Sequence, residues 1–271
     1  MRMKIRHDTV FQFEEPARSA LNILRLTPRN TDCQFVKRWR IEIDGDARLD
    51  RGEDAHGNVT HTVFVEGPLS QLRITVDGEV DTADTSGIMR GTVERLPLPL
   101  FLRASQLTQA SSALTAWATA SAAAAGSDRL AILHRLMADL HRDFDKVAVT
   151  ADLDRGVEKV FAERRGSASD LAHVLVTAAR GLGVPARVVT GYLYDDAQGT
   201  AHAWMEAWVD RVGWIGFDPS KGVCVTDRYV RVASGLDLLD AAPVRGANLG
   251  SGTEALRVSV QIEQGRQIVE A

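Results

Sequence analysis

One helix with a well-marked beginning constrains this chain more than any other feature, because strand-like runs follow it directly. Residues 167–170, Ser-Ala-Ser-Asp, fit a capping box in which Ser167 is the N-cap and Asp170 is the third helical residue. Apolar residues then recur at helical spacing until a glycine ends the helix at position 181 or 183. Ala168 is therefore expected at the first helical position.

Three strand-like runs come after Pro185, at residues 186–194, 201–209 and 212–218. Before the capped helix, an alanine-rich helix is expected to stop at Gly126, and a second helix restarts directly afterwards with a Ser-Asp cap. Helices followed by strands in this order predict an α+β fold.

The first third of the chain has a different pattern. Residues 3–85 alternate apolar and polar side chains in short runs separated by turn-rich pieces, which is typical of an antiparallel sheet with one wet face. The proline-broken segment 97–103 is interpreted as a connector. We therefore predict an antiparallel β-rich N-terminal domain at residues 1–95 and an α+β core at residues 96–271, which includes the C-terminal strands.

Charge and composition exclude several classes of partner. The 271 residues carry a formal net charge of −4, so no basic surface indicates binding to nucleic acid or to an anionic membrane. Neither a signal-peptide-length apolar run near the N-terminus nor a membrane span is visible, and a cytoplasmic location is expected. Peptides, proteins or small molecules are the expected partners, and the oligomeric state is left open.

The two cysteines do not suggest a metal site or a disulfide framework. Cys33 and Cys224 are far apart and lie in no Cys/His spacing known for zinc, so both are expected to be ordinary reduced thiols. No metal and no cofactor are predicted. His173, inside the capped helix, is interpreted as a polar helix residue rather than a ligand.

A possible catalytic pair lies on the second and third strand-like runs. A hairpin turn centred near Asp210 sets His202 opposite Asp218. A carboxylate that faces a histidine holds the imidazole in one tautomer, which is what a general base requires. The alternative is a polar cross-strand pair without a function.

The beginning of the capped helix would complete such a site. A helix N-terminus lowers the pKa of a thiol and stabilises an oxyanion, so a cysteine there would form a nucleophile, base and orienter with a His/Asp pair. The small residues Ala201, Ala203 and Ala207 would let the helix approach the sheet closely. The sulfur, however, is missing.

These motifs together resemble the bacterial transglutaminase-like superfamily, whose core has the papain-like cysteine protease fold. The resemblance is carried by RGSASDLAH (165–173), TAHAWMEAWV (200–209) and GWIGFDPSKG (213–222), and the β-rich N-terminal half is also similar. The positions that match the family's motifs are Gly166, Asp170, Ala172, His173, His202, Ala203, Trp204, Asp218, Pro219 and Ser220.

The resemblance implies a thiol-dependent hydrolase or acyltransferase that acts on peptide or amide substrates. Position 168 would be the nucleophile, His202 the general base and then the acid, and Asp218 the orienter. Ser169, Trp204 and Trp214 are expected to line the substrate groove. Two positions depart from the family pattern, because Ala168 stands in the place of the cysteine and Ser169 in the place of a glutamine.

Several explanations of Ala168 stay open. It is either an engineered Cys-to-Ala replacement or a natural loss of the nucleophile, after which the chain would bind a peptide or protein partner in the same groove. Ser167 and Ser169 are weak substitutes, because Ser167 serves as the N-cap and Ser169 points away from position 168 around the helix. A purely structural scaffold would leave the His/Asp pair without a purpose.

Overall fold

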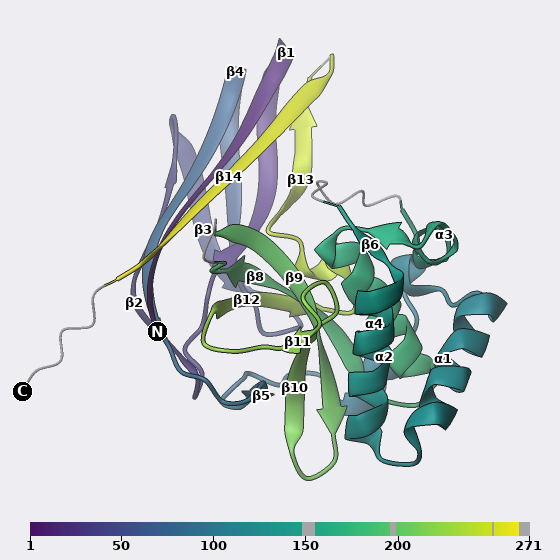
Figure 1. Cartoon of the computed structure of the whole chain (residues 1–271). Coiled ribbons are helices and arrows are strands. Elements are labelled where there is room, and N and C mark those ends of the chain that lie inside the picture. The colour runs from purple at the N-terminus through teal and green to yellow at the C-terminus, as the bar shows by residue number, and fades with distance from the viewer. Residues whose placement is uncertain (148–154, 196–198, 251, 266–271) are drawn as a thin grey trace, which may run out of the picture.

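The computed structural model describes residues 1–147, 155–195, 199–250 and 252–265. It confirms the predicted α+β fold class, with two antiparallel sheets and a layer of helices (Figure 1). In Figure 1 the N-terminal sheet rises above a core in which helices cover one side of a second sheet. Within the described ranges, no helix combines the length and the apolar character needed to cross a membrane.

The N-terminal sheet is built on two long strands. Its order is β13-β1-β4-β2, with β14 paired to β1 and β3 paired to β4. Alternate side chains of β1 are buried, as the alternating sequence predicts, and they pack in an apolar core that includes Leu24, Val63 and Ile74. The strands are β1 (Arg2–Thr27), β2 (Gln34–Ile43), β3 (Ala47–Glu53), β4 (Val59–Thr82), β13 (Val244–Leu249) and β14 (Glu254–Gln264).

The C-terminal strands do not belong to the core, contrary to our prediction. Both β13 and β14 pair antiparallel with β1, as in the pairs Leu24 with Val244 and Thr9 with Val258. Alternation in a sequence sets which face of a strand is buried, but it does not specify the partner strand. Conversely, β5 (Ile88–Met89) lies before the predicted boundary at residues 95 and 96 and pairs with a core strand. The boundary itself stays a prediction.

The core sheet has the order β11-β10-β9-β8-β12, with β5 paired to β10. Its strands are β8 (Ala186–Leu193), β9 (Thr200–Val209), β10 (Gly213–Asp218), β11 (Val223–Cys224) and β12 (Tyr229–Gly235). The remaining elements are η1 (Leu98–Leu102), η2 (Gln106–Thr108), α1 (Ser112–Ala125), α2 (Arg129–Asp143), β6 (Asp145–Lys146), α3 (Val157–Glu163), β7 (Arg165–Gly166), α4 (Ala168–Gly181) and α5 (Leu238–Ala241).

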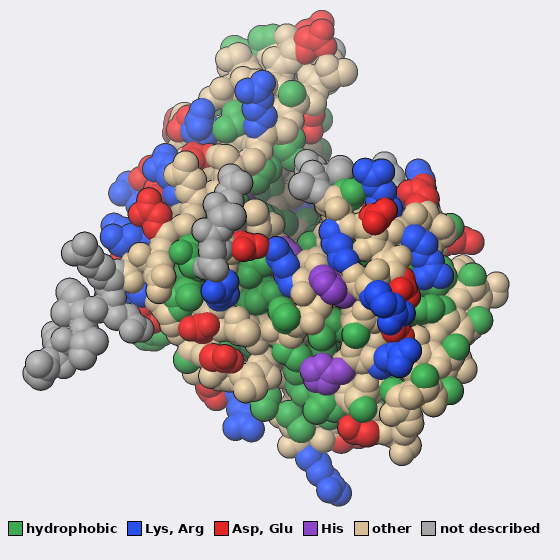
Figure 2. All heavy atoms as spheres, in the orientation of Figure 1, with side chains coloured by type: hydrophobic (Ala, Val, Ile, Leu, Met, Phe, Trp, Pro, Cys, Tyr) green, Lys and Arg blue, Asp and Glu red, His purple; other side chains and the backbone are tan. Residues whose placement is uncertain are grey.

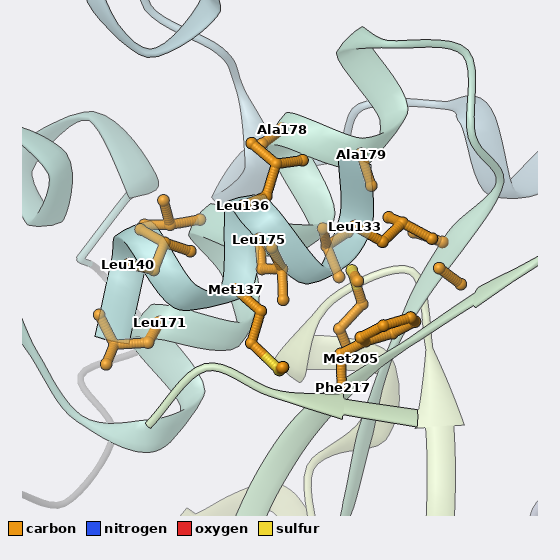
Figure 3. Packing of buried hydrophobic residues seen from close by; sticks show 14 of the residues in the cluster. Leu133, Leu136, Met137, Leu140, Leu171, Leu175, Ala178, Ala179, Met205 and Phe217 are labelled. Atoms are coloured by element: carbon orange, nitrogen blue, oxygen red, sulfur yellow. The ribbon is translucent and has the colours of Figure 1, made fainter. Parts of the chain in front are cut away.

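The helix boundaries follow the sequence signals. Gly126 ends α1 with a positive φ of 88°, and the Asp128 side chain caps α2 by accepting from two backbone N–H groups. The apolar faces of α2 and α4 meet the sheet in one buried cluster, in which Leu136 and Leu175 lie near Met205 and Phe217 (Figure 3). This packing fixes α4 against β9.

The opposite face of the core sheet holds a buried ionic network. Glu206, which is fully buried, accepts from Arg187 at 2.7 Å and from Arg231 at 2.8 Å. Arg187 also donates to both carboxylate oxygens of Glu94 at 3.0 Å. Burial would raise the pKa of Glu206, but the two guanidinium groups hold it below its ordinary value. The network therefore joins β8, β9 and β12 through charges.

We expect Glu206→Gln to lower the free energy of unfolding by about 3–5 kcal/mol, because two buried guanidinium groups would lose their shared carboxylate. Urea unfolding at pH 7 measures this loss. Glu42→Gln is the matched control, since Glu42 pairs with Arg40 at an exposed position, where an ion pair contributes about 0–1 kcal/mol. Equal losses in the two variants would contradict the role assigned to the network.

Candidate active site

His202 and Asp218 lie in direct contact. The His202 Nε2 is 2.6 Å from the Asp218 Oδ2. We predicted that the two residues lie directly opposite each other, and this is wrong. The β9–β10 turn centres on Arg211, which has a φ of 69°, rather than on Asp210. Phe217 therefore pairs with Met205, and Asp218 is level with residue 204. His202 is its diagonal neighbour on the same face, which is still within reach of long side chains.

Asp218 is buried and receives five hydrogen bonds from residues that the structure describes. Its Oδ2 accepts from His202 and, at 2.8 Å, from the Tyr229 hydroxyl. Its Oδ1 accepts from the Ser220 hydroxyl at 2.7 Å, from the Ser220 N–H at 2.9 Å and from the Lys221 N–H at 3.2 Å. Burial alone would raise the pKa of Asp218, but the hydrogen bonds from His202, Ser220 and Tyr229 hold it below its ordinary value. The carboxylate is therefore ionised near pH 7.

The imidazole of His202 is oriented through one nitrogen only. Because Asp218 is an ionised acceptor, Nε2 carries a proton, and Nδ1 is the acceptor when the ring is neutral. Among the described residues, Nδ1 forms no hydrogen bond. The Trp204 indole stacks on the imidazole at 25°, with the ring centroids 6.5 Å apart. This is the arrangement that a general base requires.

The beginning of α4 is capped as the sequence predicts. Ser167 accepts from the Asp170 N–H, and the Asp170 carboxylate accepts from the Ser167 N–H at 2.9 Å. The hydroxyls of Ser167 and Ser169 lie 2.9 Å apart, so both belong to the cap. The N–H groups of Ala168 and Ser169 have no hydrogen-bond partner within the part of the chain that the structure describes.

The connection from α4 to β8 determines which end of the sheet Ala168 approaches. A short turn, 182–185, joins the two elements, so α4 runs antiparallel to β8. The 14 residues of α4 span about 21 Å and the eight residues of β8 about 26 Å. Ala168 is therefore at the end where β9 begins, and His202 is the third residue of β9.

The faces of β9 are divided between α4 and the His202 pair. Met205 and Ala207 pack in the cluster beneath α4, together with residues of the helix. His202 belongs to the other face, with Trp204 and Glu206. Ala168 and His202 thus lie toward the same end of the sheet, with the imidazole on the face of β9 that does not pack against α4.

The three residues predicted to line a groove are buried. Trp204 lies beneath His202, with its ring 5.4 Å from that of Tyr229. Trp214 packs elsewhere, in a cluster with Phe101, and the Arg187 guanidinium lies 4.0 Å above its ring. The structure thus brings Trp204 to His202 but places Trp214 in a different buried cluster. The position of Trp214 does not fit the wall of a groove beside His202.

Sequence reasoning also missed the role of Tyr229. No motif marked this tyrosine, because its contact with Asp218 depends on how β12 returns to the sheet. His173 is a structural residue, since its Nε2 accepts from the Leu238 N–H at 3.0 Å and burial lowers its pKa to about 4. Burial raises the pKa of Cys224, and both cysteines are free.

The described residues contain no group of three or more His, Cys, Asp or Glu side chains that could hold a metal ion.

The surface shown in Figure 2 is hollowed where the N-terminal sheet meets the core. This hollow lies between the two parts of the chain that the sequence patterns distinguish.

Two family models match the chain. Residues 3–81 match the bacterial transglutaminase-like N-terminal region, and residues 115–219 match the transglutaminase-like superfamily. The second match contains the cap, His202 and Asp218.

The chain is similar over almost its whole length to mycobacterial proteins. An uncharacterized protein of Mycobacterium leprae is 30% identical over 285 residues, which cover 96% of this chain and 98% of the relative. An uncharacterized Mycobacterium tuberculosis protein is 28% identical over 291 residues, with 96% and 92% covered. A protein-glutamine gamma-glutamyltransferase of Pseudomonas aeruginosa is 34% identical over 74 residues, or 24% of this chain and 11% of that protein.

A solved structure has the same fold. A candidate cysteine protease from Cytophaga hutchinsonii superposes with a TM-score of 0.79 over 97% of this chain and 90% of that chain, at 19% sequence identity. At this identity the likeness shows the shared fold alone.

We expect Tyr229→Phe to raise the pKa of Asp218, because the carboxylate loses one donor. A hydrogen bond to a charged group contributes about 1.5–3 kcal/mol, so stability at pH 7 should fall by a similar amount. A lowered folded-state pKa adds stability above the unfolded value of about 3.9, and this stability is lost as the pH falls through the folded pKa. The variant and the parent chain should therefore converge in stability in acid.

Urea unfolding from pH 7 to pH 2 and a carbon NMR titration of the Asp218 carboxyl test this expectation. Tyr194→Phe is the control, because the Tyr194 hydroxyl does not bind Asp218. An unchanged Asp218 pKa in Tyr229→Phe would show that the hydrogen bond has no effect on the carboxylate.

Proposed function

The chain belongs to the transglutaminase-like superfamily, and we propose that His202 and Asp218 are the base and the orienter of a thiol acyl-transfer site whose nucleophile position is Ala168. The observation that carries this proposal is the 2.6 Å contact between His202 and an ionised, buried Asp218. An imidazole held in this way, whose other nitrogen has no partner among the described residues, is suited to accept a proton from a neighbouring nucleophile.

A cysteine at position 168 would use this site as follows. The His202 Nδ1 takes the proton of the thiol, and the thiolate attacks the carbonyl carbon of a peptide or amide. The oxyanion that forms accepts hydrogen bonds from the free N–H groups at the beginning of α4. The imidazolium then gives its proton to the leaving amine as the C–N bond breaks. Water, deprotonated by His202, cleaves the thioester and restores the thiol.

The chain with Ala168 has no such turnover, because a methyl group cannot attack a carbonyl. The hydroxyls of Ser167 and Ser169 bind each other in the helix cap, which argues against either one as a replacement nucleophile. We propose that this chain binds a peptide or amide substrate without cleaving it. Both origins of Ala168, an engineered replacement and a natural loss, are compatible with this behaviour.

We favour hydrolysis over protein crosslinking for the active form, because no feature of the site selects an amine over water as the acyl acceptor. The Pseudomonas aeruginosa relative named as a gamma-glutamyltransferase makes transamidation the second candidate. A peptide or protein partner and the cytoplasmic location expected from the sequence stay predictions.

The pH dependence of iodoacetamide labelling in Ala168→Cys tests the proposal. Cys33 and Cys224 are first replaced by Ser, so that position 168 is the only thiol. We expect a labelling pKa well below the ordinary thiol value of about 8.5 and a rise when His202→Ala is added, because the imidazolium stabilises the thiolate. Asp218→Asn should also raise it, since the imidazole loses its orienter.

The matched control is His134→Ala, at a histidine that packs on Phe217 without contacting Asp218. This change should leave the labelling pKa where it was. A thiol pKa near 8.5 that does not respond to His202→Ala would refute the proposed thiol site, and the search would turn to a binding function that does not use this pair.

A further inference from the structure

We propose that the N-terminal sheet positions the His202–Asp218 pair by holding the free edge of β12, the strand that carries Tyr229. Gln34 and Asn58 are the positioning residues. The proposal rests on the proposed function only in that it treats the pair as an active site. Gln34, more than 180 positions before Asp218 in the sequence, thereby controls a hydrogen bond to that carboxylate.

Within the described ranges β12 pairs with β8 alone, so it is an edge strand of the core sheet. Backbone groups on a buried strand edge need partners. Gln34 supplies them at Arg231: its Nε2 donates to the Arg231 carbonyl oxygen at 2.9 Å, and its Oε1 accepts from the Arg231 N–H at 2.8 Å. One side-chain amide thus takes the place of a neighbouring strand.

Asn58 binds the same edge in the same way. Its Nδ2 donates to the Ser234 carbonyl oxygen and its Oδ1 accepts from the Ser234 N–H, both at 2.8 Å. The register of β12 against β8 shifts between Arg231 and Ala233. An extra residue in the strand separates the two bound positions by three rather than two, so the bulge allows both to face outward.

Both amides are held firmly on the N-terminal side. The Gln34 Nε2 also donates to the Arg29 carbonyl oxygen at 2.8 Å, and the Asn58 Nδ2 also donates to the Asp54 carboxylate at 3.0 Å. Each amide is only 3% exposed. Loss of either partner would leave buried polar groups unpaired, which makes these contacts specific.

A third contact holds the chain just before β12. The Thr82 hydroxyl donates to the Asp227 carbonyl oxygen, and the N-terminal amino group lies 3.4 Å from the Asp227 carboxylate. Residues 227 and 231 are thus both bound to the N-terminal unit, and Tyr229 lies midway between them. The Tyr229 hydroxyl can reach Asp218 at 2.8 Å only while this segment stays in place.

The test compares Gln34→Ala, Tyr229→Phe and the double variant in the full chain by a carbon NMR titration of the Asp218 carboxyl, assigned with Asp218→Asn. We expect Gln34→Ala to raise the pKa of Asp218 by no more than Tyr229→Phe does. The double variant should show no further rise, because both changes remove the same hydrogen bond. A merely structural contact would not produce this coupling.

Gln12→Ala is the matched control, because Gln12 is an exposed amide on β1. If Gln34→Ala does not fold, Gln34→Glu replaces it, since the ionised side chain keeps the acceptor for the Arg231 N–H but loses the donor. An Asp218 pKa that equals the parent value in the position 34 variant, or shifts that add in the double variant, would overturn the proposal.

This titration needs no thiol, so it is independent of the labelling of Ala168→Cys. An ordinary thiol pKa together with a coupled Asp218 shift would refute the proposed function and leave the positioning intact. A low thiol pKa together with an unshifted Asp218 would do the opposite.

Discussion

The buried carboxylate of Asp218 is the group on which the candidate site depends. An ionised side chain that is fully removed from water is costly unless donors surround it. Here the donors come from three places: His202 on the neighbouring strand, the segment at Ser220 directly after β10, and Tyr229 on the far edge of the sheet. Each of these places must be correctly folded for the carboxylate to stay charged.

This requirement links the two sheets of the molecule. Tyr229 belongs to a strand whose outer edge is bound by side-chain amides from the N-terminal sheet. The same strand carries Arg231, which pairs with Glu206. β12 thus supplies a donor to Asp218 and another to Glu206, and side chains from the N-terminal part of the chain bind its outer edge.

The sequence predicted the parts of the site that depend on local rules. The capping box at Ser167 and Asp170 and the break at Gly126 follow from side chains within one turn of the backbone. The contact of His202 with Asp218 was also predicted. The turn, however, centres on Arg211 instead of Asp210, which makes the two residues diagonal neighbours. The observed register differs from the predicted one by two residues, which keeps both side chains on one face of the sheet. The predicted contact therefore still forms.

The predictions that were wrong concern contacts between residues far apart in the sequence. An alternating strand near the C-terminus carries no mark of its partner, and β13 and β14 therefore returned to β1 unpredicted. A tryptophan likewise does not reveal which cluster it enters, and Trp214 packs under Arg187 rather than beside His202. Tyr229 became part of the site only through the path of β12.

The hydrogen bonds that hold the His202–Asp218 pair are separate from those at the beginning of α4. Among the described residues, no donor to Asp218 comes from α4, and the cap of α4 uses Ser167 and Asp170 rather than the side chain at position 168. In the proposed site, exchange of a thiol for a methyl group would therefore remove the reacting atom while the proposed base, the proposed orienter and the helix N-terminus keep their own support. A sulfur placed at position 168 would enter a proposed site whose other parts are held in place by the strand edge, the buried carboxylate and the cap.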